Sequence, residues 1–364
     1  MRSTTASRRW RTIGLAFAFL ALVSCGGGGG GSSTPPTPAS KVFFTDGGNG
    51  AIASFSDATP TTNFSIDRVV MGLHTGLPTS GILAIPSITL DAANNRLYVA
   101  TQGNTFVYNN ISTANGDVAP SVTMSALINT GGPGVRGVSF CYNDLDRTHG
   151  VLYSVDFFGE VHVFNNPLTA TGKVDRIISP DLGTAVVQIS FGLAIDVARD
   201  MLYEGVALGS GSTIIVFNNA STIGTAIPAT FPPPPTTVTP VAPDRTLSFA
   251  QAVVSFYLDT TNDRLYTSHA DGVVRVFDNA RTLPTGAPTP DRTIDLGGGT
   301  PIDAYIFVDT SRNKLYAVAS NTGNQVGVFG YIANASTANG LGTGNFFSFS
   351  PVPNIALTAV AVAP

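Results

Sequence analysis

A Leu-Tyr dipeptide recurs five times along this chain of 364 residues, at intervals of 50 to 63 residues. The five copies are Leu97-Tyr98, Leu152-Tyr153, Leu202-Tyr203, Leu265-Tyr266 and Leu315-Tyr316. An aspartate precedes each leucine by six residues, and a Val-aromatic pair ends 10 to 14 residues after each tyrosine. Such self-similarity predicts one small structural unit that is repeated along the chain.

The fourth copy indicates how one unit is built. An apolar run at 252–258 suits an innermost strand that is buried on both faces. Asp259 then opens a turn, because its side chain can hydrogen-bond to the backbone that follows. Further strands are expected at 264–268, 273–277 and 291–295. Between the first two of these, Asp271-Gly272 supplies a tight hairpin.

An Asp-Arg pair begins the outer strand of four units. These pairs are Asp67-Arg68, Asp175-Arg176, Asp244-Arg245 and Asp291-Arg292. Charged side chains are typical of an exposed sheet edge, because they discourage pairing with a neighbouring strand. We therefore expect the outer strands to be exposed edges.

The repeats predict an all-β fold, namely a six-bladed β-propeller of four-stranded blades. Repeated units of roughly 40 to 50 residues made of short strands are typical of that architecture. The chain is only 12% charged and contains 39 glycines and 24 prolines, which suits short strands joined by turns. The recurring tyrosines, with Phe44 in the same frame, are interpreted as packing one blade against the next rather than contacting a ligand.

The two ends of the repeat region are predicted to share a blade. Runs at 42–46, 52–55 and 67–70 match the second, third and fourth strands of a unit, without an innermost strand before them. The run at 355–362 matches an innermost strand with nothing after it. Pairing the C-terminal strand with the N-terminal blade would close the ring and remove two open sheet edges.

The first 24 residues have the pattern of a removable leader. Four arginines precede an apolar run from Ile13 to Val23, which is too short to span a bilayer. The sequence that ends in Cys25 resembles the lipobox of bacterial lipoproteins. This resemblance implies that Cys25 is acylated and anchors the chain in a membrane. An ordinary secretory leader followed by a chance cysteine is the alternative.

Residues 25–40 are rich in Gly, Ser and Pro and are predicted to form a tether. The expected organisation is thus a signal peptide at 1–24, a tether at 25–40 and a propeller at 41–364. Gly26 directly after Cys25 resembles the sorting pattern of outer-membrane lipoproteins. The expected location is the bacterial cell envelope, at the outer membrane.

The charge balance excludes one class of partner. Removal of the leader leaves 15 basic and 23 acidic residues, a net charge of −8, which offers little attraction to phosphates. Nucleic acid is therefore not expected as a partner, and a monomer is expected. Cys141, the other cysteine of the chain, lies in an apolar stretch and is interpreted as an inert core residue.

The pattern Gly192–Asp196, followed by Leu202-Tyr203 and 215–217, resembles the repeats of NHL and lactonase-like (YVTN-type) bacterial propellers. In metal-dependent gluconolactonases of this architecture, Glu, Asn and Asp side chains converge on a metal in the channel. No such set can be matched here, where Glu160 and Glu204 are the only glutamates. The four histidines show no ligand spacing, and His162 is interpreted as a surface or packing residue. The sequence therefore predicts no catalytic residue, no metal and no cofactor.

The loops between second and third strands surround one end of the channel in a propeller, and they are the predicted ligand-binding face. The predicted contacts are Asp46, Asp156, Glu160, His269 and Asp271. The segment 46–50 is interpreted as a hairpin turn rather than a calcium loop, since it lacks spaced carboxylates. The insert from Ala226 to Pro243, with its proline run, is interpreted as a solvated loop, with docking of a partner as the alternative.

The favoured hypothesis is a non-enzymatic, membrane-tethered module that binds or scaffolds a protein, peptide or glycan at the cell envelope. The alternative is a periplasmic lactonase-like, gluconolactonase-like or lyase-like enzyme, which rests on analogy of fold alone. A purely structural module of a larger envelope assembly is a third hypothesis.

Overall fold

A computed structural model describes the parts of the chain that form the blades. The described residues are 41–56, 66–78, 87–125, 127–128, 136–137, 140–169, 174–183, 185, 187–209, 211–228, 237–296, 304–321, 326–342, 344–348 and 357–363. All of them belong to one compact unit, Pro38–Pro364. The predicted leader, tether and Cys25 lie outside the described residues.

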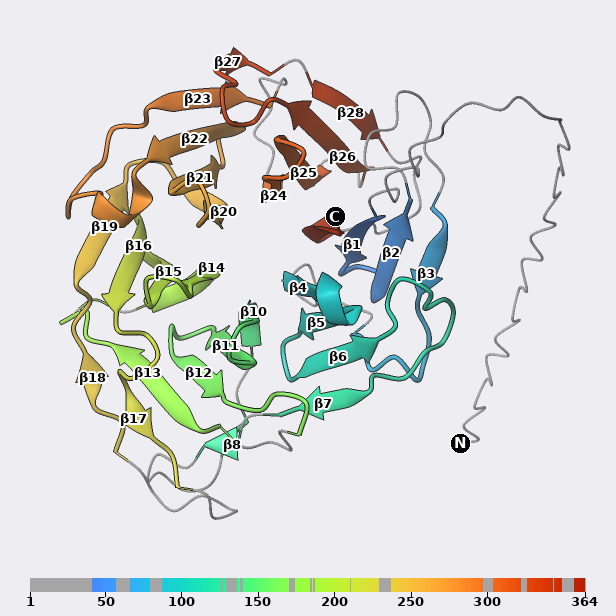
Figure 1. Ribbon diagram of the computed structural model, residues 1–364, viewed down its shortest axis with the longest axis horizontal. Coiled ribbons are helices and arrows are strands. Elements are labelled where there is room, and N and C mark those ends of the chain that lie inside the picture. The colour runs from blue at the N-terminus through green and yellow to red at the C-terminus, as the bar shows by residue number, and fades with distance from the viewer. Residues whose placement is uncertain are drawn as a thin grey trace, which may run out of the picture. The chain divides into compact units, whose positions relative to one another are not determined.

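Six small sheets follow one another around a ring, so the predicted six-bladed β-propeller is confirmed (Figure 1). Blade 1 contains β29 (Leu357–Ala363), β1 (Lys41–Asp46), β2 (Ala51–Phe55) and β3 (Arg68–Val70). Blade 2 contains β4 (Ser87–Asp91), β5 (Arg96–Ala100), β6 (Thr105–Asn109) and β7 (Val122–Met124). Blade 3 contains β10 (Phe140–Asp146), β11 (Val151–Asp156), β12 (Val161–Phe164) and β13 (Arg176–Pro180).

The other three blades repeat this order from the innermost strand outward. Blade 4 contains β14 (Val187–Asp196), β15 (Met201–Leu208), β16 (Gly211–Asn218) and β19 (Arg245–Phe249). Blade 5 contains β20 (Val253–Asp259), β21 (Arg264–His269), β22 (Val273–Asp278) and β23 (Arg292–Asp295). Blade 6 contains β24 (Ala304–Asp309), β25 (Lys314–Asn321), β26 (Val326–Ala333) and β28 (Gly344–Ser348).

Shorter elements complete the described part of the chain. They are the strand pair β8 (Leu127–Ile128) and β9 (Arg136–Gly137), the edge strands β17 (Thr225–Ala226), β18 (Pro240–Val241) and β27 (Gly340–Leu341), and the 3-10 turns η1 (Ala92–Asn94) and η2 (Ala280–Thr282).

The ring closes as predicted, between strands from opposite ends of the repeat region. β29 pairs antiparallel with β1, with Phe43 opposite Ala361 and Val42 opposite Val362. The hydroxyls of Thr45 and Thr358 add a buried hydrogen bond of 3.0 Å across this seam. Blade 1 is therefore complete only when residues 357–363 are in place.

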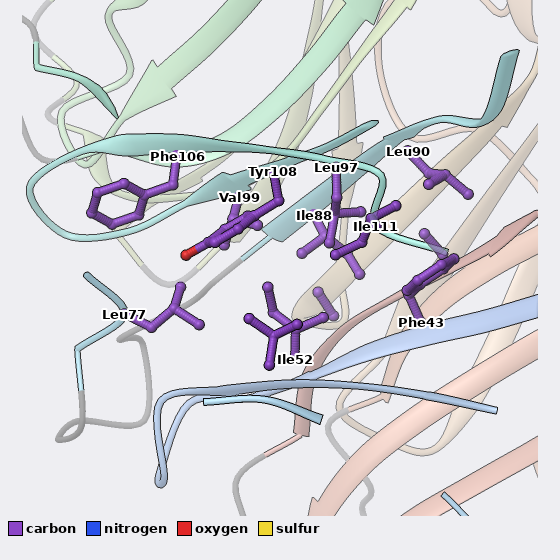
Figure 2. Close-up of a cluster of buried hydrophobic side chains, with 13 residues drawn as sticks. Phe43, Ile52, Leu77, Ile88, Leu90, Leu97, Val99, Phe106, Tyr108 and Ile111 are labelled. Carbon is purple, nitrogen blue, oxygen red and sulfur yellow. The ribbon is translucent and has the colours of Figure 1, made fainter. Parts of the chain in front are cut away.

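Each of the six blade interfaces holds one hydrophobic cluster of buried side chains. The cluster between blades 1 and 2 includes Phe43, Ile52, Leu97 and Tyr108 (Figure 2). At the other interfaces the tyrosine of one Leu-Tyr copy packs with the next blade, as Tyr98 does with the Leu152 of blade 3. The interpretation of these tyrosines as packing residues is thus confirmed.

The predicted alignment of blade 1 with the Leu-Tyr copies, which matched Phe44 to the tyrosines, is wrong by one residue. Phe43, not Phe44, faces blade 2 as the tyrosines face their following blades, whereas Phe44 packs toward blade 6 beside Tyr316. The reason is that side chains alternate between the two faces of a strand, so a shift of one residue reverses the face. Phe44 still packs blade against blade, but on the other side.

The aspartate that precedes each Leu-Tyr copy caps the turn between the first two strands, as predicted. Asp259 Oδ1 accepts hydrogen bonds from the backbone N–H groups of Thr261 (3.1 Å) and Asn262 (3.0 Å). Equivalent bonds join Asp146 to the N–H of Thr148 and Asp309 to that of Arg312. These side chains hold hairpins closed at one end of the ring.

The outer strands are not the exposed edges that we expected, because loops of the following blade cover several of them. Val70 bridges to Gly116 of blade 2, and Leu247 of blade 4 bridges to Gly286 of blade 5. The arginine of the Asp-Arg pair joins in these contacts, since Arg68 donates to the carbonyl oxygen of Thr113 at 3.1 Å. The charge at the edge thus makes a contact between blades.

The two ends of the long insert also differ from the prediction of a solvated loop. β17 and β18, which lie at its two ends, both pair with β13, the outer strand of blade 3. The partly buried side chains of Ile227 and Val238 pack on the cluster between blades 2 and 3. The insert therefore widens blade 3, although it is part of blade 4 in the sequence. Its proline run lies outside the described residues.

Candidate functional site

A cavity of about 440 Å³ lies on the axis of the ring. Its lining comes from all six innermost strands, β4, β10, β14, β20, β24 and β29, which surround the centre of the ring in Figure 1. Residues of the turns that follow innermost strands, including Ala92, Arg147 and Thr260, also line it. The cavity therefore reaches the end of the ring where the first two strands of each blade are joined.

One carboxylate and one guanidinium belong to this lining, and both come from blade 3. Asp144 accepts hydrogen bonds from the N–H groups of Leu145 and, across the interface with blade 4, Ile195, each at 2.8 Å. Arg147 contacts the neighbour on the other side of blade 3: its guanidinium donates to the carbonyl oxygen of Leu90 in blade 2 at 2.6 Å. Burial raises the pKa of Asp144 above its ordinary value, and the charge of Arg147 offsets part of this shift.

Tyrosines from three blades give the cavity an aromatic wall with polar tips. Tyr142 of blade 3 and Tyr305 of blade 6, the blade on the opposite side of the ring, both line the cavity. Burial is the main cause that raises the pKa of Tyr142 well above its ordinary value, and electrostatic repulsion from Tyr305 is the second. Tyr257 of blade 5 packs edge-on against Phe307, with ring centroids 5.1 Å apart. Such rings offer both stacking surface and hydroxyl groups to a ligand.

None of the five predicted ligand contacts lines this cavity. Asp46, Asp156, Glu160, His269 and Asp271 all lie in or beside the turns between second and third strands, on blades 1, 3 and 5. Three of the five make local contacts within their own blade. The structure brings Asp156 and Glu160 together in blade 3, and in blade 5 the charges of His269 and Asp271 act on each other.

Asp46 and Asp271 each take part in the turn of their own blade. Asp46 Oδ1 accepts from the N–H groups of Gly48 (3.0 Å) and Asn49 (3.3 Å), which agrees with the interpretation of this segment as a hairpin turn. Asp271 forms an ion pair with Arg275 at 2.7 Å. Hydrogen bonds from Arg275, and to a lesser extent its charge, lower the pKa of Asp271 although burial opposes them.

His269 is a buried residue of blade 5, with 1% of its surface exposed. Its Nε2 lies 2.7 Å from the hydroxyl of Thr267, and its ring packs edge-on against Phe249. Burial, together with the charge of Arg275, lowers its pKa to about 4. His269 is therefore neutral at pH 7 and contributes to the core.

Asp156 and Glu160 join His162 in a cluster at the turn between β11 and β12 of blade 3. One potential ligand atom of each residue lies within 4.8 Å of the others, and this is the one such group of three or more among the described residues. His162 is fully buried, and its Nε2 lies 3.3 Å from Asp156 Oδ2. From the sequence, His162 is interpreted as a surface or packing residue because it alternates within a strand, and its complete burial excludes the surface. The signal that groups it with Glu160 is their spacing of two residues, which puts both side chains on one side of the chain.

Glu204 of blade 4 contacts the same turn from the neighbouring blade. It lies between Leu202 and Val206 on the face of β15 that packs on blade 3. Its side chain is fully buried, and neither carboxylate oxygen has a hydrogen-bond partner. A Cβ atom placed on Gly159 would lie 3.1 Å from Glu204 Oε1. Burial, and then the charge of Asp156, raise the pKa of Glu204 well above its ordinary value.

Cys141 is also buried in blade 3, with 2% of its surface exposed. Burial and the nearby charge of Asp156 raise the pKa of its thiol. Because the thiolate is the reactive form, this environment agrees with the interpretation of Cys141 as an inert core residue.

Comparison with known proteins supports the fold but identifies neither a family nor a function. No family model matches the sequence, and no curated protein matches it. A solved structure entitled "Crystal structure of Nidogen/Laminin Complex" contains a similar chain, with a TM-score of 0.52 and 13% identity. The match covers 89% of this chain and 98% of that one. Among the described residues, no helix has the length and apolar character that crossing a membrane requires.

Proposed function

We propose that this protein is a membrane-tethered binding module of the bacterial cell envelope that holds a protein or peptide partner at the mouth of its central cavity. The observation that carries the proposal is the cavity of about 440 Å³, with Tyr142, Tyr257 and Tyr305 in its wall and Asp144 and Arg147 beside them. That volume falls within the range of about 300 to 1,000 Å³ that is typical of ligand sites.

The chemistry of the lining favours a segment that carries both polar and apolar groups. Aromatic rings can pack against a side chain or a sugar ring, while the carboxylate and the guanidinium fix its orientation. Aromatic residues and arginine are also the residues that dominate binding energy at protein interfaces. A glycan remains the alternative ligand of the same site.

The similar solved chain lends support to a protein partner, since its title describes a complex of nidogen and laminin. At 13% identity this is support for the architecture as a binding scaffold and not for a common partner. The envelope location rests on the resemblance of the Cys25 segment to a lipobox and on the tether at 25–40.

The enzyme alternative receives less support from the lining. Of the described residues that line the cavity, Asp144 is the only carboxylate, and Asn143 is the only side-chain amide. A lactonase of the gluconolactonase type would require several carboxylates and amides to converge on one point. We therefore favour binding.

The test is to screen the purified full chain against peptide and glycan arrays and to measure each binder by calorimetry. We expect R147A and D144N to weaken binding about tenfold, because removal of one charge-assisted hydrogen bond costs roughly 1.5 kcal/mol or more. D271N, which lies in a turn that does not line the cavity, is the matched control. Binders that are indifferent to both cavity variants would contradict the proposal.

The tether is tested separately by fractionation of cells that express the full chain. We expect the native protein in the membrane fraction and the C25S variant in the soluble fraction, because acyl chains on Cys25 would supply the anchor. An unchanged distribution of C25S would support the ordinary secretory leader instead.

A further inference from the structure

The turn between β11 and β12 combines donor atoms that the proposed binding cavity does not use. We propose that Asp156, Glu160 and His162 form a binding site for a divalent transition-metal ion, with zinc as the preferred ion. This site lies away from the channel lining, so the inference stands independently of the proposed function.

The pairing of the two strands puts the three side chains on one face of the hairpin. Ser154 lies opposite His162, and Val155 lies opposite Val161. The two valines belong to the cluster that packs on blade 4, so they point to that side. Because side chains alternate along a strand, Asp156, Glu160 and His162 share the other face. The convergence of their ligand atoms within 4.8 Å follows from this register.

The turn also prepares the carboxylate of Asp156 for an ion. Its Oδ1 accepts hydrogen bonds from the N–H groups of Phe158 (2.8 Å) and Glu160 (2.9 Å), which fixes the plane of the carboxylate. Its Oδ2 is left facing the imidazole of His162 at 3.3 Å. Gly159 has a φ of 79°, a conformation that glycine adopts at little cost and that returns the chain into β12.

Two buried polar groups at this turn have no hydrogen-bond partner. One is His162 Nδ1, in a side chain that is fully buried. The other is the carboxylate of Glu204, which is also fully buried, lies against Gly159 and has both oxygens unpaired. Unpaired buried polar groups are costly and therefore rare. Glu204 approaches Gly159 from the blade 4 side of the hairpin, opposite the face that carries the three ligands, so it is not a ligand of the proposed site. The unpaired Nδ1 of His162 belongs to one of the three ligands themselves.

The donor set selects the class of metal. An imidazole nitrogen with two carboxylate oxygens suits zinc and other first-row transition metals, whereas calcium and magnesium prefer oxygen ligands throughout. Three protein ligands leave at least one coordination position for water or for a group of a partner. Phe158, in the same turn, is 65% exposed.

Blade 1 provides an internal comparison. Asp46 caps its turn as Asp156 does, but Ala51 and Ala53 occupy the paired positions that correspond to Glu160 and His162. The same backbone device thus occurs without the other two ligands. D46N therefore changes a similar turn without touching the proposed site.

The experiment is equilibrium dialysis of the full chain against Zn²⁺, with Mn²⁺, Ca²⁺ and Mg²⁺ in parallel and the bound metal measured by mass spectrometry. We expect one equivalent of Zn²⁺ per native chain and a melting temperature that rises with Zn²⁺ concentration. E160Q and H162Q should each weaken Zn²⁺ binding at least tenfold. D46N should bind Zn²⁺ as the native chain does.

A second control addresses adventitious binding at the surface. His149 is exposed and pairs with Asp146 at 2.6 Å, so H149Q should leave the bound equivalent unchanged. If H162Q fails to fold, E160Q still tests the proposal. Glu160 is only partly buried, so its substitution should leave the fold intact. Absence of bound Zn²⁺ in the native chain, or equal affinity of the native chain and E160Q, would overturn the proposal.

Discussion

The guanidinium of Arg245 donates a hydrogen bond of 3.0 Å to the carbonyl oxygen of Leu283, and this contact joins the outer strand of blade 4 to a loop of blade 5. The same Nη1 also donates to the carbonyl oxygen of Ala280 at 3.2 Å. Arg176 makes the corresponding contact between blades 3 and 4, to the carbonyl oxygen of Ala220 at 2.9 Å. The recurring Asp-Arg pair is therefore an element of blade assembly.

We expect R245A to lower the free energy of unfolding by about 1 to 3 kcal/mol, because it leaves two partly buried carbonyl groups without their charged donor. Urea denaturation measures this change. R281A is the control, since Arg281 is 48% exposed and its ion pair with Asp263 should contribute less than about 1 kcal/mol. Equal effects of the two substitutions would argue against a role of Arg245 in blade assembly.

Removal of residues 357–364 should lower the melting temperature by roughly 10 °C or more, or prevent folding. The deletion exposes the partners of a whole buried strand, and each large apolar side chain lost from a core costs about 1.5 to 3 kcal/mol. A synthetic peptide of sequence 357–363 should restore part of the loss by pairing with β1. A deletion variant with an unchanged melting temperature would refute closure through this strand.

His269 should make the fold less stable in mild acid. Its pKa is lowered to about 4 in the folded protein, whereas the unfolded chain takes up a proton below the ordinary value of about 6.5. Between these values the unfolded state binds more protons, so the stabilisation is complete above pH 6.5 and is lost as the pH falls. Urea denaturation at pH 7.5 and pH 5 should show a loss of about 2 kcal/mol from this residue. The loss should shrink in H269Q, and an identical pH dependence in both proteins would contradict the assignment.

E204M should stabilise the metal-free protein by about 1 to 3 kcal/mol. The substitution replaces a fully buried carboxylate, whose oxygens have no hydrogen-bond partner, by an apolar side chain of similar size. Thermal denaturation in the presence of a chelator measures the gain. E160M removes the other glutamate of the chain from a partly exposed position and should not stabilise. Destabilisation by E204M would show that Glu204 has a partner in the apo protein.

The sequence predicted the parts of the fold that local patterns encode. The Leu-Tyr repeats, the capping aspartates and the alternation of apolar residues predicted the strands of blade 5 to within two residues, as β20 at 253–259 against 252–258 shows. The seam could be predicted because one end lacked an innermost strand and the other end supplied one. Contacts between blades were harder to predict, because loops that cover outer strands carry no periodic pattern.

The candidate sites could be predicted only in part for a similar reason. Asp156 and Glu160 are adjacent in one turn, so the sequence already grouped them. Glu204 lies 44 positions further along the chain and contacts this turn only after blades 3 and 4 pack together. Its one signal in the sequence is a charged residue within the apolar run 201–208. The cavity, lined by six separate strands, has no signature in any single segment.

The seam between β29 and β1 has a consequence for biosynthesis. The outer three strands of blade 1 are the first strands of the propeller to be synthesised. Blade 1 receives its innermost strand, β29, only after residues 357–363 have been synthesised. Until then the ring is open and β1 lacks its partner strand, and such an edge invites pairing with other chains. Protection of β1 during synthesis, by a chaperone or by slow release of the chain, would then decide how much of the protein reaches its native ring.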